Sequence, residues 1–318
     1  MTTAWIFPGQ GSQAVGMGRD LYEQFPAARA IFDQADEVLG LPISRLCFEG
    51  PEVALTATEN AQPALLTVSM ALLRAVEEAT GRPLALPLAV AGHSLGEYSA
   101  LVAGGALAFA DALRLVRRRG ELMAEAHEGS MAAVIGMAET ELEQICREVS
   151  ESLSSHAETV GTVVVANYNA PDQLVISGSA LAVEHAGLLA RERGARRVLP
   201  LKVSAAFHSP LMLHAAEGMA RAIELAPVSD LRVPLVANVT AEPLWTADDV
   251  RREAVAQVVA PVRWIASVQR MARDGATTFV EFGPGKVLTG LVRRIVPEAR
   301  LVNVSSADDV RGIAAESR

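Results

Sequence analysis

Short apolar runs recur along the chain and mark the strands that we expect. Each run has a helix-like apolar period nearby. Runs of this kind are typical of strands in a parallel sheet whose two faces are covered by helices. The pattern therefore predicts an α/β fold with a mainly parallel sheet. The runs are residues 4–7, 84–91, 233–239, 277–282 and 301–304.

The pattern changes between about residues 129 and 204. We predict strands at 130–137, 162–167, 173–177 and 197–203, helices at 139–153 and 180–193, and a turn at 169–172. The order βαββαβ is that of a ferredoxin-like unit. Because sheet-forming segments continue on both sides, we expect residues 129–204 to be a small ferredoxin-like subdomain. It would be inserted into a larger catalytic subdomain made of residues 1–128 and 205–318.

Length and composition are those of a globular chain. The 318 residues, half of them apolar, are enough for one large domain with an insertion. No apolar run is long enough to span a membrane, and the N-terminal residues lack the pattern of a secretory signal. We therefore expect a cytoplasmic protein without a membrane partner. The net charge of −9 argues against nucleic acid as a partner. Cys47 and Cys146 are expected to be reduced core residues.

A glycine-framed serine follows one of the apolar runs. Residues 92–96 read Gly-His-Ser-Leu-Gly, and a segment with apolar positions at helical spacing begins there. In this frame a strained turn between strand and helix lifts the serine hydroxyl above the sheet, where helix amides can stabilise negative charge. A chance match in an alanine- and glycine-rich chain is the alternative, and the strand-to-helix context disfavours it. Ser94 is the candidate nucleophile.

A serine nucleophile needs a base, and the chain has six histidines. His208 follows a predicted strand end and precedes a predicted helix, which is where a sheet would support a base. His93 is adjacent to the serine and is expected to be structural. Spacing typical of a metal site is missing, so no metal is expected. The remaining histidines are weaker candidates for the base: His127, His156, His185 and His214.

Arg119 interrupts the apolar face of a predicted helix at residues 111–126. A guanidinium on an inward face is costly unless an anion or carbonyl oxygens satisfy it. The sequence leaves two explanations open. One is a structural partner such as a buried aspartate or glutamate, and the other is a substrate carboxylate gripped close to Ser94.

Two glycine-rich loops follow predicted strands. Residues 7–13 read Phe-Pro-Gly-Gln-Gly-Ser-Gln, which lacks the spacing of a nucleotide-binding loop. A loop that presents a backbone amide and Gln10 to an adjacent active site fits better. Residues 283–286, Gly-Pro-Gly-Lys, resemble part of a phosphate-binding loop but lack its first glycine, and we interpret them as a strand-to-helix turn.

Taken together, these segments resemble the malonyl-CoA:acyl carrier protein transacylase family, the acyltransferases of fatty-acid and polyketide synthesis. The resemblance covers nearly the whole chain in order, and the series is far more specific than any single motif. Its segments are 7–13, Gly-His-Ser-Leu-Gly-Glu at 92–97, Arg119-Gly120, Gly-Ser-Met-Ala-Ala at 129–133, Asn-Tyr-Asn at 167–169, Phe207-His208, Gln257, Pro-Val-Arg-Trp at 261–264 and Gly-Pro-Gly-Lys-Val-Leu-Thr-Gly at 283–290.

The resemblance implies a large α/β-hydrolase-like subdomain with a ferredoxin-like insertion, in agreement with the apolar pattern. It implies malonyl-CoA as substrate and no permanently bound cofactor. The implied partners are a CoA thioester and an acyl carrier protein. Ser94 would be the nucleophile, His208 the general base and acid, and Arg119 the clamp for the free carboxylate of the malonyl group.

The resemblance also implies roles for residues around the serine. The amides of Gln10 and Leu95 would form the oxyanion hole. Gln257 would help to orient the site, through the loop that carries Gln10, and Asn169 would border it. In the resemblance, Phe207 indicates malonyl as the transferred group, because an aromatic ring beside the α-carbon would exclude a methyl branch.

Alternatives remain at this point. A carrier-directed acyl hydrolase on the same fold is disfavoured by the carboxylate clamp and by the chain order of serine and histidine, and a non-catalytic carrier-binding protein is disfavoured by the full set of polar site residues. Residues 204–208 look more like polyketide-type acyltransferases than like the fatty-acid enzyme, so both pathways stay open. Because carrier proteins are typically acidic, the sequence predicts docking near a basic cluster. Its members are Arg191, Arg193, Arg196 and Arg197.

Overall fold

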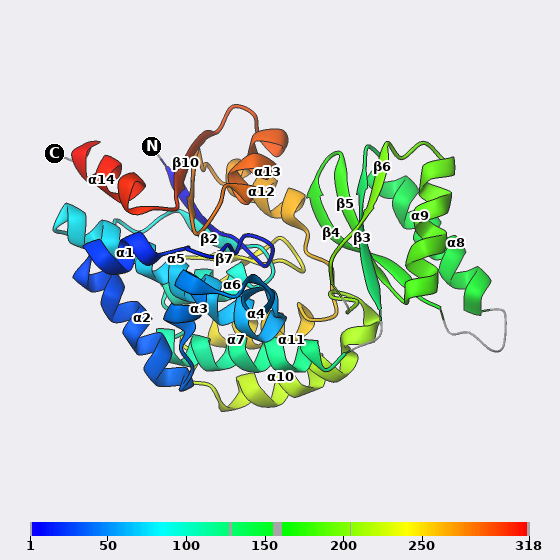
Figure 1. The fold of residues 1–318 in the computed structure, drawn as a ribbon. Helices are drawn as coiled ribbons and strands as arrows, with labels where there is room; N and C mark the ends of the chain where they lie inside the picture. Colours follow the sequence, from blue (N-terminus) through cyan, green and yellow to red (C-terminus); the bar gives the residue numbers. More distant parts are fainter. Residues whose placement is uncertain (1, 127–128, 155–160, 204, 317–318) are drawn as a thin grey trace.

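A larger body with a mainly parallel sheet and a smaller body with an antiparallel sheet lie side by side in the computed structural model (Figure 1). The chain enters the smaller body once and returns to the larger one, where both labelled chain ends lie. This arrangement confirms the predicted α/β fold class with an inserted subdomain. The exact boundaries of the two units stay a prediction. The structure describes residues 2–126, 129–154, 161–203 and 205–316.

In the described part of the chain, the larger sheet has six strands in the order β10-β9-β1-β2-β7-β8. All neighbours are parallel except β8, which pairs antiparallel with β7 at one edge. The serine-bearing turn therefore follows a central strand, β2. The strands are β1 (Thr3–Phe7), β2 (Ala89–Gly92), β7 (Leu235–Val236), β8 (Pro243–Leu244), β9 (Thr278–Phe282) and β10 (Arg300–Val304).

Several strands are shorter than predicted, and three of them show the largest differences. The run at 84–91 becomes a strand only at Ala89, because Pro87 has no N–H for the ladder. The run at 233–239 ends its ladder at Val236, since the backbone N–H of Asn238 donates instead to a Glu97 carboxyl oxygen. The strand predicted at 197–203 ends at Pro200, although the Leu201 N–H still donates to the Met131 oxygen at 2.9 Å. The short strand β8 was not predicted.

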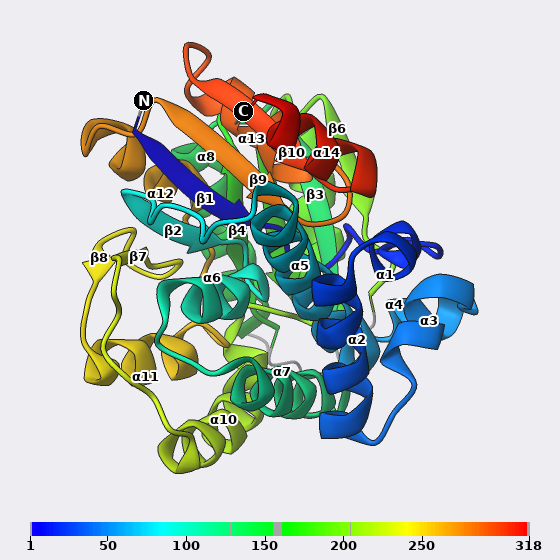
Figure 2. The same ribbon diagram turned by 90° about the vertical axis from the view of Figure 1, so that its left-hand side faces the viewer.

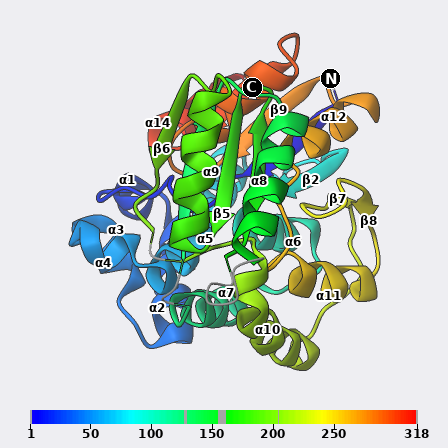
Figure 3. The same cartoon turned by 90° about the vertical axis from the view of Figure 1, so that its right-hand side faces the viewer.

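The smaller sheet has the strand order β4-β5-β3-β6 within the described residues, and all its neighbours are antiparallel. Helices α8 (Glu139–Ser154) and α9 (Ala180–Glu192) lie next to each other on its outer face, as Figure 3 shows. The order βαββαβ is the one that the sequence predicts. The strands are β3 (Ser130–Ile135), β4 (Val163–Ala170), β5 (Gln173–Gly178) and β6 (Arg197–Pro200).

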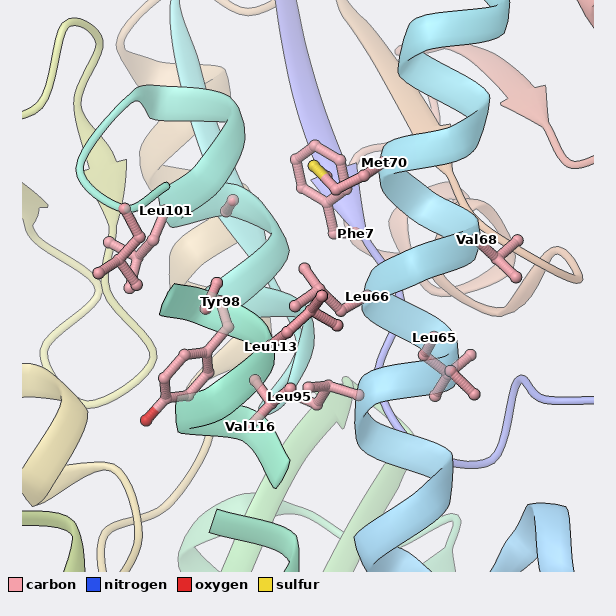
Figure 4. Packing of buried hydrophobic residues seen from close by; sticks show 14 of the residues in the cluster. Phe7, Leu65, Leu66, Val68, Met70, Leu95, Tyr98, Leu101, Leu113 and Val116 are labelled. Atoms are coloured by element: carbon pink, nitrogen blue, oxygen red, sulfur yellow. The ribbon is translucent and has the colours of Figure 1, made fainter. Parts of the chain in front are cut away.

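Helices cover both faces of the larger sheet (Figure 2). On β1, Ala4 and Ile6 face α12 and α13, whereas Trp5 and Phe7 face a cluster to which α5 contributes most. Figure 4 shows α5 packing there against Phe7 and α6. The helices of this body are α1 (Arg19–Gln24), α2 (Pro26–Leu39), α3 (Ile43–Glu49), α4 (Glu52–Thr56), α5 (Thr58–Thr80), α6 (Gly96–Gly104), α7 (Phe109–Ala124), α10 (Leu213–Leu225), α11 (Ala247–Ala256), α12 (Trp264–Arg273), α13 (Val287–Ile295), α14 (Ala307–Glu316) and a 3-10 turn at Pro210–Met212.

Across the residues that the structure describes, no helix is both long and apolar enough to cross a membrane.

Candidate active site

Ser94 lies on the turn between β2 and α6 and has the strained backbone that its motif predicts. Its φ is +50°, which is unfavourable for a residue with a side chain. The flanking glycines serve a different purpose: a Cβ on Gly92 would lie 1.9 Å from the Gly96 carbonyl carbon, and one on Gly96 would lie 2.0 Å from the Phe7 oxygen. Ser94 therefore has the strain itself, while the glycines let the backbones approach closely.

His208 lies in the segment that follows the smaller body in the chain, between β6 and the 3-10 turn, and its ring contacts the serine. Its Nε2 lies 2.8 Å from Ser94 Oγ, and its Nδ1 lies 2.8 Å from the backbone oxygen of Gln257 and 3.1 Å from that of Ala260. Because carbonyl oxygens only accept hydrogen bonds, Nδ1 has the proton and Nε2 accepts from the serine hydroxyl. Main-chain oxygens thus select the tautomer that a general base requires.

The environment of His208 keeps its ring neutral. The side chain is 3 % exposed. Burial, and then the charge of Arg119, lower the pKa of His208 to about 3. A neutral imidazole with a free Nε2 lone pair can take a proton from Ser94 at neutral pH.

Arg119 on α7 is 1 % exposed and points at Ser94. Its Nη2 donates to Ser94 Oγ at 3.0 Å and to the Gln257 side-chain oxygen at 2.8 Å, and Nη1 donates to Gln62 at 2.9 Å. Its guanidinium carbon also lies 5.8 Å from the centre of the Tyr98 ring. No carboxylate in the described residues forms an ion pair with Arg119. The first explanation for this arginine, a buried aspartate or glutamate as its partner, is therefore not supported in that part of the chain.

A cavity of about 350 Å³ opens onto the serine between the larger and smaller bodies. Its walls combine main-chain turns, aliphatic side chains and the polar site residues. Phe207 lies in this wall, next to His208, and Lys202 lies in it too. The lining residues are Gln10, Gly11, Gln13, Thr56, His93, Ser94, Leu95, Arg119, Met123, Met131, Asn167, Leu201, Lys202, Val203, Phe207 and His208.

Gln10 and Leu95 both line this cavity, as expected for an oxyanion hole. Neither backbone N–H has a hydrogen-bond acceptor among the described residues. The Gln10 side chain accepts from Thr58 Oγ1 at 2.6 Å, which fixes the loop of residues 7–13. A Cβ on Gly9 would lie 2.3 Å from the His93 oxygen, so this loop packs directly on the serine turn.

Gln257 contacts the site directly and not through the loop that carries Gln10, and Asn169 is not among the residues that line the cavity. Gln257 contacts Arg119 and the Ser94 carbonyl, and none of its hydrogen bonds in the described chain reaches Gln10. The Asn169 Oδ1 is 2.7 Å from Nε2 of His93, which lines the cavity. The neighbouring Asn167 lines the cavity instead. The register of β4 against β5 is irregular between Tyr168 and Ala170, so the regular alternation of side chains is interrupted at Asn169.

The other histidines do not approach the serine as a base. His93 bonds to Asn169, and His185 is exposed on α9. His214 is exposed and lies 3.8 Å from Glu125. His127 and His156 lie outside the described residues. Within the described ranges, no group of three or more His, Cys, Asp or Glu side chains could hold a metal ion. Cys47 and Cys146 are both buried and free.

Three buried polar residues around the site were missed by the sequence reasoning. Asn238 accepts from the Ser94 backbone N–H at 2.7 Å, Gln62 accepts from Arg119, and Glu97 accepts from Asn238. Glu97 could have been found from the sequence, because a glutamate in the first turn of an otherwise apolar helix needs a hydrogen-bond partner. Gln62 and Asn238 lie far from the motif in sequence and carried none.

A strained serine beside a neutral imidazole, backbone amides without acceptors and a buried guanidinium form a site for acyl transfer through a seryl ester. The α/β fold with its inserted antiparallel subdomain and this site define the class of serine-dependent acyltransferases.

Comparison with known proteins agrees. Residues 4–310 match the acyl transferase domain family, and the chain belongs to this family. It is 46 % identical over 311 residues to the malonyl CoA-acyl carrier protein transacylase of Bacillus subtilis, covering 96 % of this chain and 94 % of that protein. It is 43 % identical over 298 residues to the protein of the same name from Escherichia coli K12, covering 92 % of each.

Solved structures show the same fold. An acyl-carrier-protein S-malonyltransferase from Bartonella henselae has a TM-score of 0.92 at 42 % identity, covering 100 % of this chain and 99 % of that one. A malonyl-transacylase in complex with a type II PKS acyl-carrier protein has a TM-score of 0.93 at 38 % identity, covering 99 % of this chain and 100 % of that one.

Proposed function

We propose that this protein transfers a malonyl group from coenzyme A to the phosphopantetheine thiol of an acyl carrier protein, through an ester on Ser94, in fatty-acid or polyketide biosynthesis. The observation that carries the proposal is Arg119. Its guanidinium is buried beside the nucleophile, and its hydrogen-bond partners in the described chain are neutral. The names of the relatives agree with malonyl as the acyl group and with a carrier protein as the acceptor.

The first half-reaction forms the ester. His208 Nε2 takes the Ser94 proton as Oγ attacks the thioester carbonyl carbon, and the negative oxygen that forms accepts from the backbone N–H groups of Gln10 and Leu95. The carbon–sulfur bond then breaks, and His208 returns its proton to the sulfur of coenzyme A. The second half-reaction runs in reverse with the carrier thiol: His208 takes the thiol proton, sulfur attacks the ester, and Ser94 recovers its proton.

Arg119 selects the acyl group in this scheme. A malonyl carboxylate replaces neutral acceptors around the guanidinium with a charge-assisted pair. A monocarboxylic acyl chain brings no such partner and leaves the buried charge unpaired, a penalty of roughly 1–3 kcal/mol. The same preference argues against an acyl hydrolase of broad specificity, since such an enzyme has no use for a carboxylate clamp.

Coenzyme A thioesters act here as substrates, and we propose that no cofactor is permanently bound. The cytoplasmic location remains a prediction from the sequence pattern. So do the boundaries of the catalytic subdomain at 1–128 and 205–318 and of the inserted subdomain at 129–204.

Intact-protein mass spectrometry tests the proposal directly. Brief mixing with malonyl-CoA should add one malonyl group to the wild-type protein and none to Ser94→Ala. Addition of holo carrier protein should then move the label from Ser94 to the carrier. A sample without carrier protein should keep its label over the same time. A label that water releases as fast as the carrier removes it would indicate the hydrolase instead.

A further inference from the structure

Glu97 is a buried carboxyl three residues after the nucleophile, in the first turn of α6, and it is 2 % exposed. It does not line the cavity. Three N–H groups of the described residues point at its two oxygens. Oε1 accepts from the backbone N–H of Asn238 at 2.8 Å and from its side-chain nitrogen at 3.0 Å, and Oε2 accepts from the Gln257 side-chain nitrogen.

The two amides that meet at Glu97 both turn their oxygen toward the active site. The Gln257 oxygen accepts from Arg119 Nη2 at 2.8 Å, while its nitrogen faces Glu97 and the Ser94 carbonyl. The Asn238 oxygen accepts from the Ser94 backbone N–H at 2.7 Å, while its nitrogen faces Glu97 and the Gly92 carbonyl. One carboxyl group thus contacts the donor end of both amides.

An amide has one end that accepts and one end that donates, so its direction matters. A guanidinium and a backbone N–H can only donate, and each therefore needs the amide oxygen. If either amide turned over, its NH₂ group would face Arg119 or the Ser94 N–H with no bond possible. Burial would make that mismatch costly.

We propose that Glu97 is a positioning residue that fixes the direction of the Gln257 and Asn238 amides, and through them places the Arg119 guanidinium and the Ser94 turn. The inference rests on the proposed function, because Arg119 acts there as the clamp for the malonyl carboxylate. Glu97 itself touches neither the substrate nor the reacting atoms.

The neighbouring Glu253 does not change this role. Its carboxyl lies beside Glu97, is also buried, and accepts from the Val239 N–H at 2.9 Å. Burial and the charge of Glu253 raise the pKa of Glu97. A carboxyl group accepts at both oxygens whether it is ionised or donates one proton to Glu253, so either state holds both amides. A glutamine at position 97 cannot, because one of its two ends is a donor.

Glu97→Gln is the direct test, with the ratio of malonyl to acetyl labelling of Ser94 as the readout. Loss of the amide direction should lower this ratio roughly tenfold or more, because Arg119 is no longer aimed at the carboxylate. The matched control is Glu281→Gln, which alters another buried glutamate. Glu281 accepts from the backbone N–H groups of Leu288 and Thr289, away from the cavity. Its variant should lose stability but keep the wild-type ratio.

A double variant separates positioning from general damage. In the Arg119→Ala background, Glu97→Gln should leave the malonyl-to-acetyl ratio unchanged, since the clamp is already gone. If Glu97→Gln does not fold, Glu97→Asp keeps both acceptor oxygens on a shorter chain and should lower the ratio less steeply. A wild-type ratio in folded Glu97→Gln or Glu97→Asp would overturn the inference. Failure of the wild-type protein to take up malonyl on Ser94 would instead overturn the proposed function.

Discussion

The Nδ1 atom of His208 lies 2.8 Å from the backbone oxygen of Gln257, where many serine enzymes place an aspartate. A carbonyl oxygen orients the imidazole without adding a negative charge. The resulting dyad stays close to a buried guanidinium, and a second carboxylate beside the base would compete with the substrate for that charge. The arrangement suits an enzyme whose substrate brings its own carboxylate.

Arg119→Ala should reduce malonyl transfer strongly and leave acetyl transfer unchanged or raised, because the clamp is lost while the dyad remains. The expected loss of malonyl kcat/KM is on the order of 100-fold, equivalent to about 3 kcal/mol. Steady-state transfer from both CoA thioesters measures it. Arg114→Ala, at an exposed position of the same helix, is the control. An equal fall for malonyl and acetyl would refute the clamp.

The rate of Ser94 acylation should show no step near pH 6.5. Burial and Arg119 lower the pKa of His208 to about 3, so the ring stays neutral and active above that value. Acidification should remove activity only as the pH falls toward 3, where protonation blocks Nε2. The pH profile of kcat/KM for malonyl-CoA measures this property of the free enzyme. An activity loss centred near pH 6.5 and absent in stability controls would contradict it.

Gly96→Ala should destabilise the protein severely, because the added Cβ would meet the Phe7 backbone 2.0 Å away. The main chain cannot move aside as the end of a flexible side chain can. We therefore expect the free energy of unfolding to fall by about 3 kcal/mol or more. Gly290→Ala in α13 is the control, since its added Cβ meets nothing within 4 Å and alanine favours the helix. In thermal unfolding, Tm should fall for Gly96→Ala and rise for Gly290→Ala.

Phe207→Ala should let a methyl-branched acyl group enter. The ring lies in the cavity wall beside His208, and its removal opens space next to the nucleophile. We expect labelling by methylmalonyl-CoA to rise roughly tenfold relative to malonyl-CoA. Mass spectrometry of Ser94 with mixed donors reports the ratio. Phe207→Tyr keeps the ring and should retain the wild-type preference, and loss of preference there would point away from ring volume.

Arg197→Glu should slow transfer to the carrier protein without changing the labelling of Ser94 by malonyl-CoA. The other predicted docking arginines are already engaged: Arg193 pairs with Glu148 at 2.6 Å, Arg196 with Asp172 at 3.5 Å, and Arg191 donates to the Val198 oxygen at 2.8 Å. Arg197 is exposed on β6, so its charge reversal should weaken the binding of an acidic carrier protein most. Arg114→Glu on the larger body is the charge-matched control. Equal effects of both would sink the docking prediction.

Much of the fold was predictable because its signals are local. The apolar runs located β1, β9 and β10, and the βαββαβ order of the insertion followed from periodicity and a turn at Pro171-Asp172. Apart from the unpredicted strand β8, the errors fell at strand ends. There Pro87 lacks an N–H, and Asn238 gives its N–H to a side chain, so the ladder stops while the apolar pattern continues.

By itself, the sequence predicted Ser94 as the candidate nucleophile, His208 as the candidate base and Arg119 as a charge in need of a partner, because each breaks a local pattern: a glycine-framed serine, a histidine at a strand end and a charge on an apolar face. It could not say what Arg119 meets. Only the tertiary structure decided that Gln62, Gln257 and Ser94 surround the guanidinium, and that a main-chain oxygen orients His208. These hydrogen bonds join positions 25 to 138 residues apart and leave no periodic trace, because they depend on where the folded chain brings its turns together.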